Sequence, residues 1–504
     1  GNERRRQFFA CFDFIVPIAC SQIYTTYMMT SGMMGGAIRG KLPATLGFVA
    51  SPRVGQPASD PALVCRSQAS SKALLDWIVA NGAPKQAVTL KSVERGGRQI
   101  DVTVADRALK AGDIALRVPE NLIVTLAQIF ECGDASELLT TNKLSELAVL
   151  TLYLCYEKKK GKDSAIYPFI KELDRQAARG SQGAKSPLLW GVEDLELLTG
   201  SPVVGEIEER LHGIHREYEE LDLVWVMGSA LFRNYPFEMP TEQFPFEVFL
   251  QAFAAIQAAT VHLQGVEPSM RFALVPLGPP LLTYSSMSKA LIKYDETSKE
   301  VQLAVDRDYE PGDEIVAWCG PQPNRRLLLN YGVVDDNNPY DKMAVTITIP
   351  NNNDDLFRLK RSIVSSESLK LSTNQTFQLS ASKPIPEHLL PYLRLAFAGS
   401  QEECERVNFQ DDDAIVSTEN EQLVLSALMA HIQNRLDRYL TSMDQDETII
   451  TNPDSTARQV VAAKLLRAEK AILLESLGCV ADRAMKGSTV GMLSQEAYRG
   501  VKIA

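Results

Sequence analysis

Residues 275–331 contain the pattern that most restricts how this chain can fold. Two β-runs, Glu300–Val305 and Glu314–Trp318, are joined by the turn Glu310-Pro-Gly-Asp313, in which proline fixes one backbone angle and glycine permits a positive one. A segment rich in proline and hydroxyl residues precedes this predicted hairpin, and a leucine run and an Asn-Tyr-Gly turn follow it. This order predicts a β-rich module that ends in a tyrosine turn.

A second group of short β-runs lies much earlier in the chain. Val88–Val93, Ile100–Val104 and Ile114–Val118 are rich in β-branched residues and are separated by glycine-containing turns. Between the two groups the apolar residues recur at helical spacing instead. The helical segments that we predict are 72–81, 144–160, 206–233 and 246–263, followed by a strand at 343–349, a polar linker at 350–355 and further helices from residue 356.

The composition limits the classes of partner. The net charge is −11 over 504 residues and the pI is near 5.2, whereas binding to nucleic acid or to an anionic membrane needs clustered Lys and Arg. The eight cysteines are scattered, with no CxxC pair and no Cys/His cluster at metal-ligand spacing. We therefore expect reduced thiols, no metal, no nucleic acid and no membrane span.

The first 71 residues differ in composition from the rest. They hold seven Lys or Arg residues against three acidic ones, together with many small and hydroxyl side chains. This composition is typical of a plastid or mitochondrial transit peptide, and Val64-Cys65-Arg66 resembles a plastid processing site. The apolar run Phe8–Cys20 leaves a signal-peptide core as an alternative. We expect residues 1–71 to be a leader and the protein to act in the chloroplast stroma.

Several motifs resemble the SET-domain proteins of the plant Rubisco large-subunit lysine methyltransferase family. They are the pattern of residues 275–331, Ala111–Pro119, Trp190 with the Glu-Asp-Leu that follows it, and His388–Leu395. The resemblance implies an α+β fold, in which a SET-type β-rich domain with a helical insert precedes an all-helical C-terminal domain that holds the protein substrate. The boundaries that we predict are 1–71 for the leader, 72–349 for the SET domain, about 135–262 for its insert, 356–480 for the C-terminal domain and 481–504 for a tail.

The same resemblance implies a reaction, which is protein-lysine N-methylation with S-adenosyl-L-methionine (AdoMet) as cofactor. A plastid protein such as the Rubisco large subunit is the implied substrate. The cofactor contacts that correspond to the family's are Gly96 and Gly97 in the first β-group and Thr283-Tyr284-Ser285, which stands where the family has Asn-His-Ser. The implied catalytic positions are Tyr331, which matches the family, and Cys319, which replaces its late tyrosine.

Most of these contact positions depart from the family's pattern. Thr283 and Tyr284 replace the Asn and His, and the helix that carries an Arg-x-Arg pattern in the family has Gln257 and Ala259 here, which leaves no cation on that helix for the cofactor carboxylate. Two interpretations follow. The chain is either a methyltransferase-like protein with a degenerate cofactor and lysine site, or a catalytically inactive SET-fold module that binds proteins in a plastid complex.

Three further features allow other chemistry. Cys319 could be a nucleophile, although no histidine is near it in the sequence. His212 and His215 share one helical face with acidic neighbours, which is compatible with a metal ligand pair and with a solvated charged face. A basic face for nucleic acid would depend on three cations at helical spacing, namely Lys464, Arg467 and Lys470.

Overall fold

The computed structural model describes most of the chain beyond the predicted leader. The described residues are 73–95, 98–131, 144–177, 182–231, 245–279, 281–366, 368–486 and 501–503. The predicted leader (1–71), the turn residues Gly96 and Gly97, and most of the predicted tail lie outside them.

The fold begins with the helix at residues 73–80 and an antiparallel hairpin. Strand β1 (Val88–Arg95) pairs with β2 (Arg98–Ala105) along its whole length, with Arg95 opposite Arg98 at the closed end. This pairing confirms the first two predicted β-runs.

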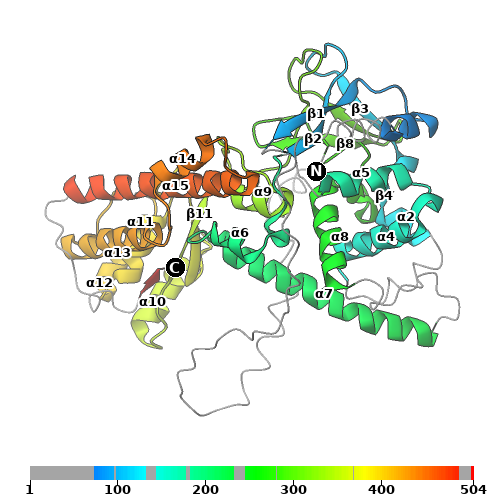
Figure 1. The fold of residues 1–504 in the computed structure, drawn as a ribbon. Helices are drawn as coiled ribbons and strands as arrows, with labels where there is room; N and C mark the ends of the chain where they lie inside the picture. Colours follow the sequence, from blue (N-terminus) through cyan, green and yellow to red (C-terminus); the bar gives the residue numbers. More distant parts are fainter. Residues whose placement is uncertain are drawn as a thin grey trace. The chain divides into compact units, whose positions relative to one another are not determined.

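The two β-rich parts of the sequence meet in one sheet. Strand β3 (Ile114–Pro119) pairs antiparallel with β9 (Glu300–Ala304), and β9 also pairs with β8 (Ile292–Asp295), so the strand order is β3-β9-β8. The sequence had predicted that the early and late β-groups belong together. The helical segments between them are therefore an insertion into one β-rich frame (Figure 1).

The hairpin predicted within residues 300–318 does not form. Strand β10 (Val316–Trp318) pairs parallel with β7 (Thr283–Ser285), in a different sheet from β9. The reason lies in the two turns around Gly112 and Gly312, which bond across to the other β-group. The Gly112 N–H donates to Val305 O and the Gly312 N–H donates to Ala105 O, both at 2.8 Å. The residues on either side of the turn at 310–313 thus pair with the first β-group, so they do not form a hairpin with each other.

A third small sheet ends the predicted helix at 246–263 early. Helix α8 (Phe246–Ala259) stops at Ala259, and the next residues form β5 (Thr260–His262). Strand β5 pairs with β6 (Phe272–Leu274), which also pairs with β4 (Val124–Thr125). The β-branched residues of Thr-Val favour this change from helix to strand.

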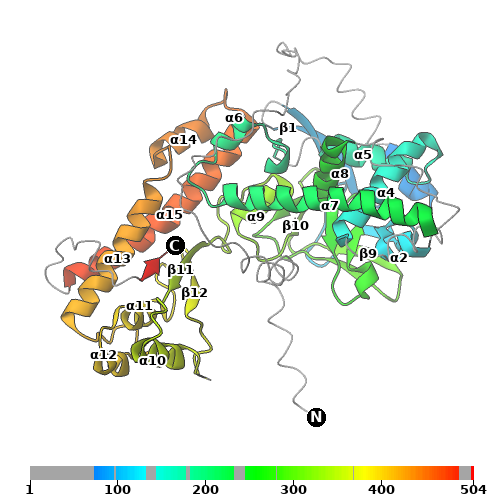
Figure 2. The same ribbon diagram turned by 90° about the horizontal axis from the view of Figure 1, so that it is seen from below.

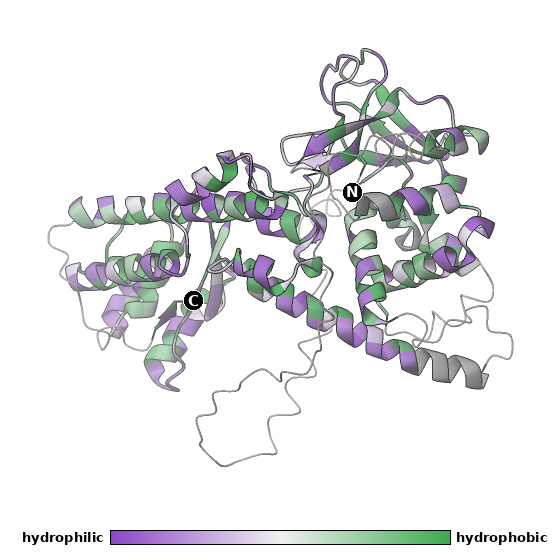
Figure 3. Ribbon diagram, viewed as in Figure 1, coloured by the Kyte–Doolittle hydropathy of each residue, from purple (hydrophilic) through white to green (hydrophobic). Residues whose placement is uncertain are grey.

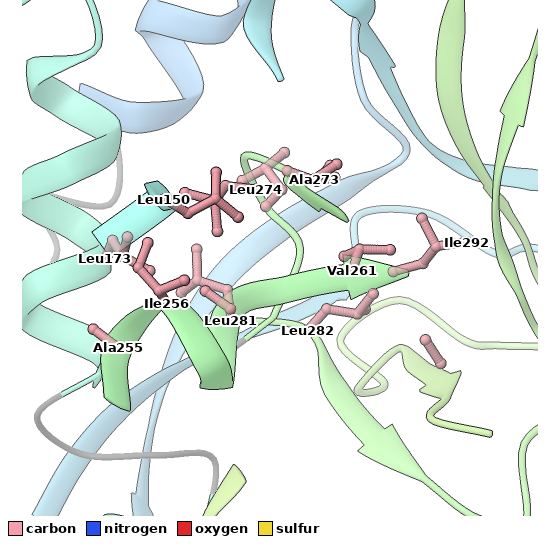
Figure 4. Packing of buried hydrophobic residues seen from close by; sticks show 14 of the residues in the cluster. Leu150, Leu173, Ala255, Ile256, Val261, Ala273, Leu274, Leu281, Leu282 and Ile292 are labelled. Atoms are coloured by element: carbon pink, nitrogen blue, oxygen red, sulfur yellow. The ribbon is translucent and has the colours of Figure 1, made fainter. Parts of the chain in front are cut away.

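The insert packs helices over the β-frame. Ser145 begins α4 by accepting a hydrogen bond from the Ala148 N–H at 3.2 Å, and three lysines occupy the last turn of that helix, where the helix dipole favours cations. Figure 4 shows Leu150 and Ile256 of two helices packed with Leu281 and Leu282 from the β-frame. The elements of this region are η1 (Glu120–Leu122), α2 (Leu126–Glu131), α4 (Glu146–Lys160), η2 (Gly161–Asp163), α5 (Tyr167–Ala177), η3 (Pro187–Leu189), α6 (Val192–Glu196), α7 (Val203–Leu231) and η5 (Pro268–Met270).

The C-terminal part, which was predicted to be all-helical, is mostly helical but also contains a small sheet. Strand β11 (Met343–Thr348) lies between β12 (Asn374–Leu379) and β13 (Lys502–Ile503). The sequence prediction from residue 356 onward did not include β12, although its polar and apolar residues alternate. The helices are α10 (Asp355–Val364), α11 (Leu389–Phe397), α12 (Gln401–Arg406), α13 (Thr418–Leu436), α14 (Met443–Thr451) and α15 (Ala457–Lys486).

Two hydrophobic cores share one helix. The first core includes Val461 and Leu465 of α15, and the second includes Leu466 and Leu473 of the same helix. Figure 2 shows α15 running beside α13 and α14, and Figure 3 shows both apolar and polar residues along it. The helix therefore contributes apolar surface to the SET-type core and to the C-terminal core.

The two cores are also joined by buried polar contacts. Gly200, just before α7, has φ +95, and a Cβ built on it would lie 2.7 Å from Arg438 O. The carboxylate of Glu469 on α15 accepts hydrogen bonds from Ser201 Oγ and from the Tyr439 hydroxyl, both at 2.9 Å. Glu469 is 2% exposed, and burial, the first cause, raises its pKa to about 7.

The three cations that could have formed a basic face are each paired with acidic groups. Lys464 Nζ lies 2.7 Å from Asp336, whose other oxygen contacts Arg467. Arg467 also contacts Glu447, and Lys470 pairs with the buried Asp446. This arrangement leaves little unbalanced positive charge on that face of α15. None of the described helices is long and apolar enough to cross a membrane.

Candidate functional site

The predicted residues Thr283, Tyr284 and Ser285 form strand β7. Its parallel pairing with β10 places Thr283 opposite Val316 and Ser285 opposite Trp318. Because side chains alternate along a strand, Tyr284 lies on the other face of this small sheet from Thr283 and Ser285. Cys319 is the residue that follows β10. The pairing of β10 with β7 therefore brings the predicted catalytic position Cys319 together with the predicted cofactor positions in β7.

The third predicted position approaches from the end of a helix. Helix α9 (Asn324–Tyr331) ends at Gly332, which has φ +68 and packs so tightly that an added Cβ would lie 2.6 Å from Ala184 O. This ending places the Tyr331 ring edge-on to Tyr284, with centroids 4.9 Å apart. The predicted catalytic residues Tyr331 and Cys319 thus share one site with Tyr284, which we call the reaction centre.

The reaction centre is neutral at physiological pH. Burial, and then the nearby charge of Asp335, raise the pKa of the Cys319 thiol to about 12. Burial also raises the pKa of Tyr331 to about 12, partly offset by a hydrogen bond with Gln322. Tyr284 is half-buried as a residue, but its hydroxyl is shielded from water, so its pKa lies well above the ordinary value. None of the three can act as a base near pH 7.

Thr283 belongs to a polar network on the opposite face of the strand. Its hydroxyl donates to Glu314, and the same carboxylate pairs with Arg95 of β1. Arg95 is the residue immediately before Gly96 and Gly97, the predicted cofactor turn. The network therefore links Thr283 to the end of β1, and the predicted cofactor residues Gly96 and Gly97 lie outside the described residues.

The position of Gln257 corrects one sequence inference. Gln257 is buried on α8, where its amide donates to Leu329 O at 3.0 Å and accepts a hydrogen bond from Arg210 of α7. The helix itself carries no cation at this point, but a second helix brings one to it. Burial, followed by the repulsion of Arg326, lowers the pKa of Arg210. Sequence reasoning missed Arg210 because its link to Gln257 is purely tertiary.

Two polar residues beside the reaction centre, Ser286 and Asp335, were also missed. The hydroxyl of the predicted Ser285 accepts a hydrogen bond from the Met287 N–H at 3.2 Å, within a local turn. The next residue, Ser286, donates its backbone N–H to Asp335 Oδ2 at 2.6 Å. Strand alternation from Tyr284 could have pointed to Ser286, whereas Asp335 is brought in only by the end of α9.

The other catalytic alternatives receive little support. The Cys319 thiol contacts Gly320 O at 3.7 Å, and with a pKa of about 12 it is not a ready nucleophile. His215 pairs with Glu219 on its own helix at 3.3 Å and packs on Phe246, as on a charged helix surface. In the described ranges, no group of three or more His, Cys, Asp or Glu residues is placed to hold a metal.

Comparison with known proteins finds the same fold in a SET-domain protein and a family match in the C-terminal part. Residues 351–473 match the Rubisco LSMT substrate-binding family. The chain is similar to the solved structure of Rubisco LSMT bound to AdoMet, with a TM-score of 0.65 and 19% identity over 86% of this chain and 96% of that one. It is equally similar to the SET domain of LSMT bound to lysine and AdoHcy, with a TM-score of 0.65 and 18% identity.

The curated proteins to which the chain is similar are named as methyltransferases of histidine and not of lysine. Actin-histidine N-methyltransferase of Mus musculus is 23% identical over 84% of this chain and 69% of its own length. The protein of the same description from Xenopus tropicalis is 22% identical over 81% of this chain and 69% of its own length.

The split β-frame with its helical insert has the fold of the solved Rubisco LSMT structures, and residues 351–473 match the Rubisco LSMT substrate-binding family. The resemblance and the α+β fold inferred from the sequence are both confirmed.

Proposed function

We propose that this chain is an AdoMet-dependent protein N-methyltransferase with a degenerate reaction centre, and that it acts on a plastid protein. The observation that carries the proposal is the meeting of Tyr284, Cys319 and Tyr331 from two strands and a helix end. Similar proteins bind AdoMet, AdoHcy or lysine or are named as protein methyltransferases.

The donor set formed by Arg210 and Gln257 suits a cofactor with an amino-acid end. Arg210 presents a guanidinium beside Gln257, and its hydrogen bond to that amide leaves other N–H groups for a carboxylate. Gly96 and Gly97 are the proposed backbone approach for the cofactor, and Thr283 is the proposed neighbouring hydroxyl. AdoMet would supply an activated methyl group there, while the protein's own contribution is to orient the acceptor nitrogen.

Low activity is part of the proposal. The Thr283 hydroxyl is already committed to Glu314, and Cys319 supplies only a weak donor at a position where the family has a phenol. Loss of one fixed donor to a developing charge typically costs about 3 kcal/mol of transition-state stabilisation. We expect methyl transfer that is at least a hundredfold slower than an enzyme with the family's full set of contacts.

Ligand binding is the first test. Thermal unfolding of the whole protein should shift upward with increasing AdoMet or AdoHcy, because a ligand that binds only the folded state stabilises it in proportion to the logarithm of its concentration. Arg210→Gln should weaken this shift, and Lys293→Gln on the exposed side of β8 is the matched control. No shift at millimolar cofactor would overturn the enzyme proposal.

A binding module is the second candidate, and one observation favours it. The Tyr284 ring packs on Tyr331, and the Thr283 hydroxyl is held by Glu314, so these two predicted cofactor contacts already have partners inside the protein. In this case the protein would retain a plastid partner through residues 351–473 without binding AdoMet. A missing cofactor shift combined with a measurable affinity for a purified partner, with the Rubisco large subunit tested first, would favour the module.

The plastid location is also proposed, on the composition of residues 1–71. A fluorescent protein fused to these residues should enter chloroplasts when expressed in leaf cells. The matched control replaces the arginines and Lys41 of this segment with glutamine, which should abolish import. Import of neither fusion would contradict the proposed location.

A further inference from the structure

Helix α15 carries a second apolar stripe, separate from the side that it packs into the C-terminal core. The packed side includes Leu473, Val480 and Ala484, which are buried in that core. On the solvent side, apolar residues recur at alternating steps of three and four, which is the heptad spacing of a coiled-coil seam. We call this stripe the α15 seam, and its members are Ala471, Leu474, Gly478, Ala481 and Met485.

The α15 seam is open to solvent in the described part of the chain. Leu474 is 44% exposed and Met485 is 78% exposed. The described ion pairs between α14 and α15 involve Arg467 and Lys470, which both precede the seam, and Figure 1 shows the last turns of α15 extending past α14. Single exposed apolar residues are common on proteins, but a row of them in register along one helix is typical of an interface.

Gly478, in the middle of the seam, has no role in the packing of the described chain. A glycine inside a helix is less favourable than an alanine. A Cβ built on Gly478 would meet no described atom within 4 Å outside the helix's own backbone, so crowding does not require glycine here. A missing side chain does allow a second helix to approach closely, because the distance between packed helices depends on the side chains at their contact.

The charges beside the seam define the kind of helix that fits it. Glu475 and Asp482 each directly follow a seam residue, so they share one flank of the seam, at heptad position e. Both are exposed, and neither forms an ion pair or hydrogen bond through its carboxylate within the described residues. The other flank holds Leu477 and Ala484, which pack into the chain's own core. Two unpaired carboxylates on the free flank favour a helix that carries Lys or Arg there.

A second copy of this chain fits the seam poorly. In an antiparallel pair of α15 helices, position e of one helix faces position e of the other, so Glu475 and Asp482 would meet carboxylates. In a parallel pair they would meet apolar residues or Lys470, whose ammonium group already pairs with the buried Asp446. Flanking charges of this kind decide which helices pair in a coiled coil, and here they oppose self-association.

We infer that the α15 seam binds an amphipathic helix of a partner protein, with apolar residues at heptad spacing and Lys or Arg along its flank. The seam spans residues 471–485, which is about 21 Å of helix, so the partner helix needs about four turns. The match to the Rubisco LSMT substrate-binding family ends at residue 473, and most of the seam lies beyond it. The inference therefore goes beyond the proposed function and does not depend on cofactor binding.

The test uses the whole protein and two synthetic helical peptides of about 21 residues. Both peptides carry leucine at heptad spacing, and they differ only at the flanking positions, which are lysine in one and glutamate in the other. Fluorescence anisotropy at about 0.15 M salt should show that the lysine peptide binds at least tenfold more tightly. Glu475→Gln combined with Asp482→Asn should remove most of this preference, which separates the two flanking carboxylates from the negative charge of the protein as a whole.

Variants of the seam itself separate binding from folding. Leu474→Gln combined with Met485→Gln should weaken the lysine peptide at least tenfold. The matched control is Leu440→Gln, which changes a residue that is 73% exposed and lies outside the seam, and it should leave binding unchanged. Gly478→Gln should also weaken binding at least tenfold without lowering the unfolding temperature, because glutamine favours a helix more than glycine does.

Several results would overturn the inference without touching the proposed function. They are binding of neither peptide, equal affinity for both, or unchanged binding in the Leu474 and Met485 double variant. A dimer in sedimentation that this double variant dissociates would make a second copy the occupant. A Leu474→Cys thiol that iodoacetamide fails to modify, read by mass spectrometry of peptides, would mean that residues 487–500 or another part of this chain already cover the seam.

Discussion

Replacing Glu469 with glutamine should stabilise the protein near neutral pH and have little effect in acid. Glu469 is buried between the two cores, and both its oxygens accept hydrogen bonds from neutral hydroxyls, those of Ser201 and Tyr439. Burial is the main cause of its raised pKa, and the repulsion of Asp341 adds to it against the attraction of Arg325. A glutamine fits the same space without a charge, and the two hydroxyls can rotate to serve its amide.

The magnitude follows from the pKa difference between the folded and unfolded states. The pKa of Glu469 rises from an ordinary 4.5 to about 7 on folding, and each pKa unit corresponds to about 1.4 kcal/mol of free energy. Because the folded-state pKa is raised, the folded protein holds the proton more tightly, and the loss of stability develops as pH rises from 4.5 to about 7. The full cost is about 3 kcal/mol, of which about 2 kcal/mol develops between pH 5 and pH 7.5.

Urea unfolding of wild type and Glu469→Gln at these two pH values is the measurement. The variant should gain about 2 kcal/mol on the wild type over this interval. Glu421→Gln is the matched control, because Glu421 forms a two-point ion pair with the buried Arg394 at 2.6 and 2.9 Å, so the same substitution there should destabilise at both pH values. Parallel pH profiles for wild type and Glu469→Gln would refute the reasoning.

Three further outcomes test other parts of the structure. Gly200→Ala should cost at least about 2 kcal/mol more in urea unfolding than Gly82→Ala, because both glycines have φ +95 but only the first has backbone where the new Cβ would lie; equal losses would contradict this. Cys319 should react with iodoacetamide at pH 8 more than tenfold more slowly than Cys479, read by mass spectrometry of peptides, since its pKa is about 12; equal rates would disprove the shielding. Arg394→Met should cost about 2 to 3 kcal/mol in thermal unfolding, because it removes a buried cation and leaves the half-buried carboxylate of Glu421 unpaired, and no loss would contradict a stabilising role for this pair.

Local patterns in the sequence predicted most of the elements but not all their partners. Alternating β-branched residues marked β1, β2, β3 and β9, and helical periodicity marked α4 and α8. The Pro-Gly turn at 310–313 suggested a hairpin that does not form. A turn signal shows that the chain reverses direction, but it does not show which strand the chain then pairs with. The backbone bonds of Gly112 and Gly312 join segments far apart in sequence, and such pairings carry no local signature.

The sequence likewise predicted only some of the residues at the reaction centre. Tyr331, Cys319 and Tyr284 were found through a family motif. Their proximity in space could be expected from the shared fold alone. Asp335 and Arg210 reach the site from a helix end and from a separate helix, so no spacing rule would select them. The departures at Thr283 and Gln257 were visible in the sequence, but the network with Glu314 and the cation that compensates Gln257 were not.

The placement of α15 in both hydrophobic cores has a consequence for dissecting the protein. A cut at the end of the SET-type frame would remove Val461 and Leu465 from the core that they complete, and an isolated C-terminal piece would display the same side chains to water. Neither half should be self-sufficient, and the two should melt in a single transition. Any natural shuffling of these modules would therefore have to carry the long terminal helix along with both.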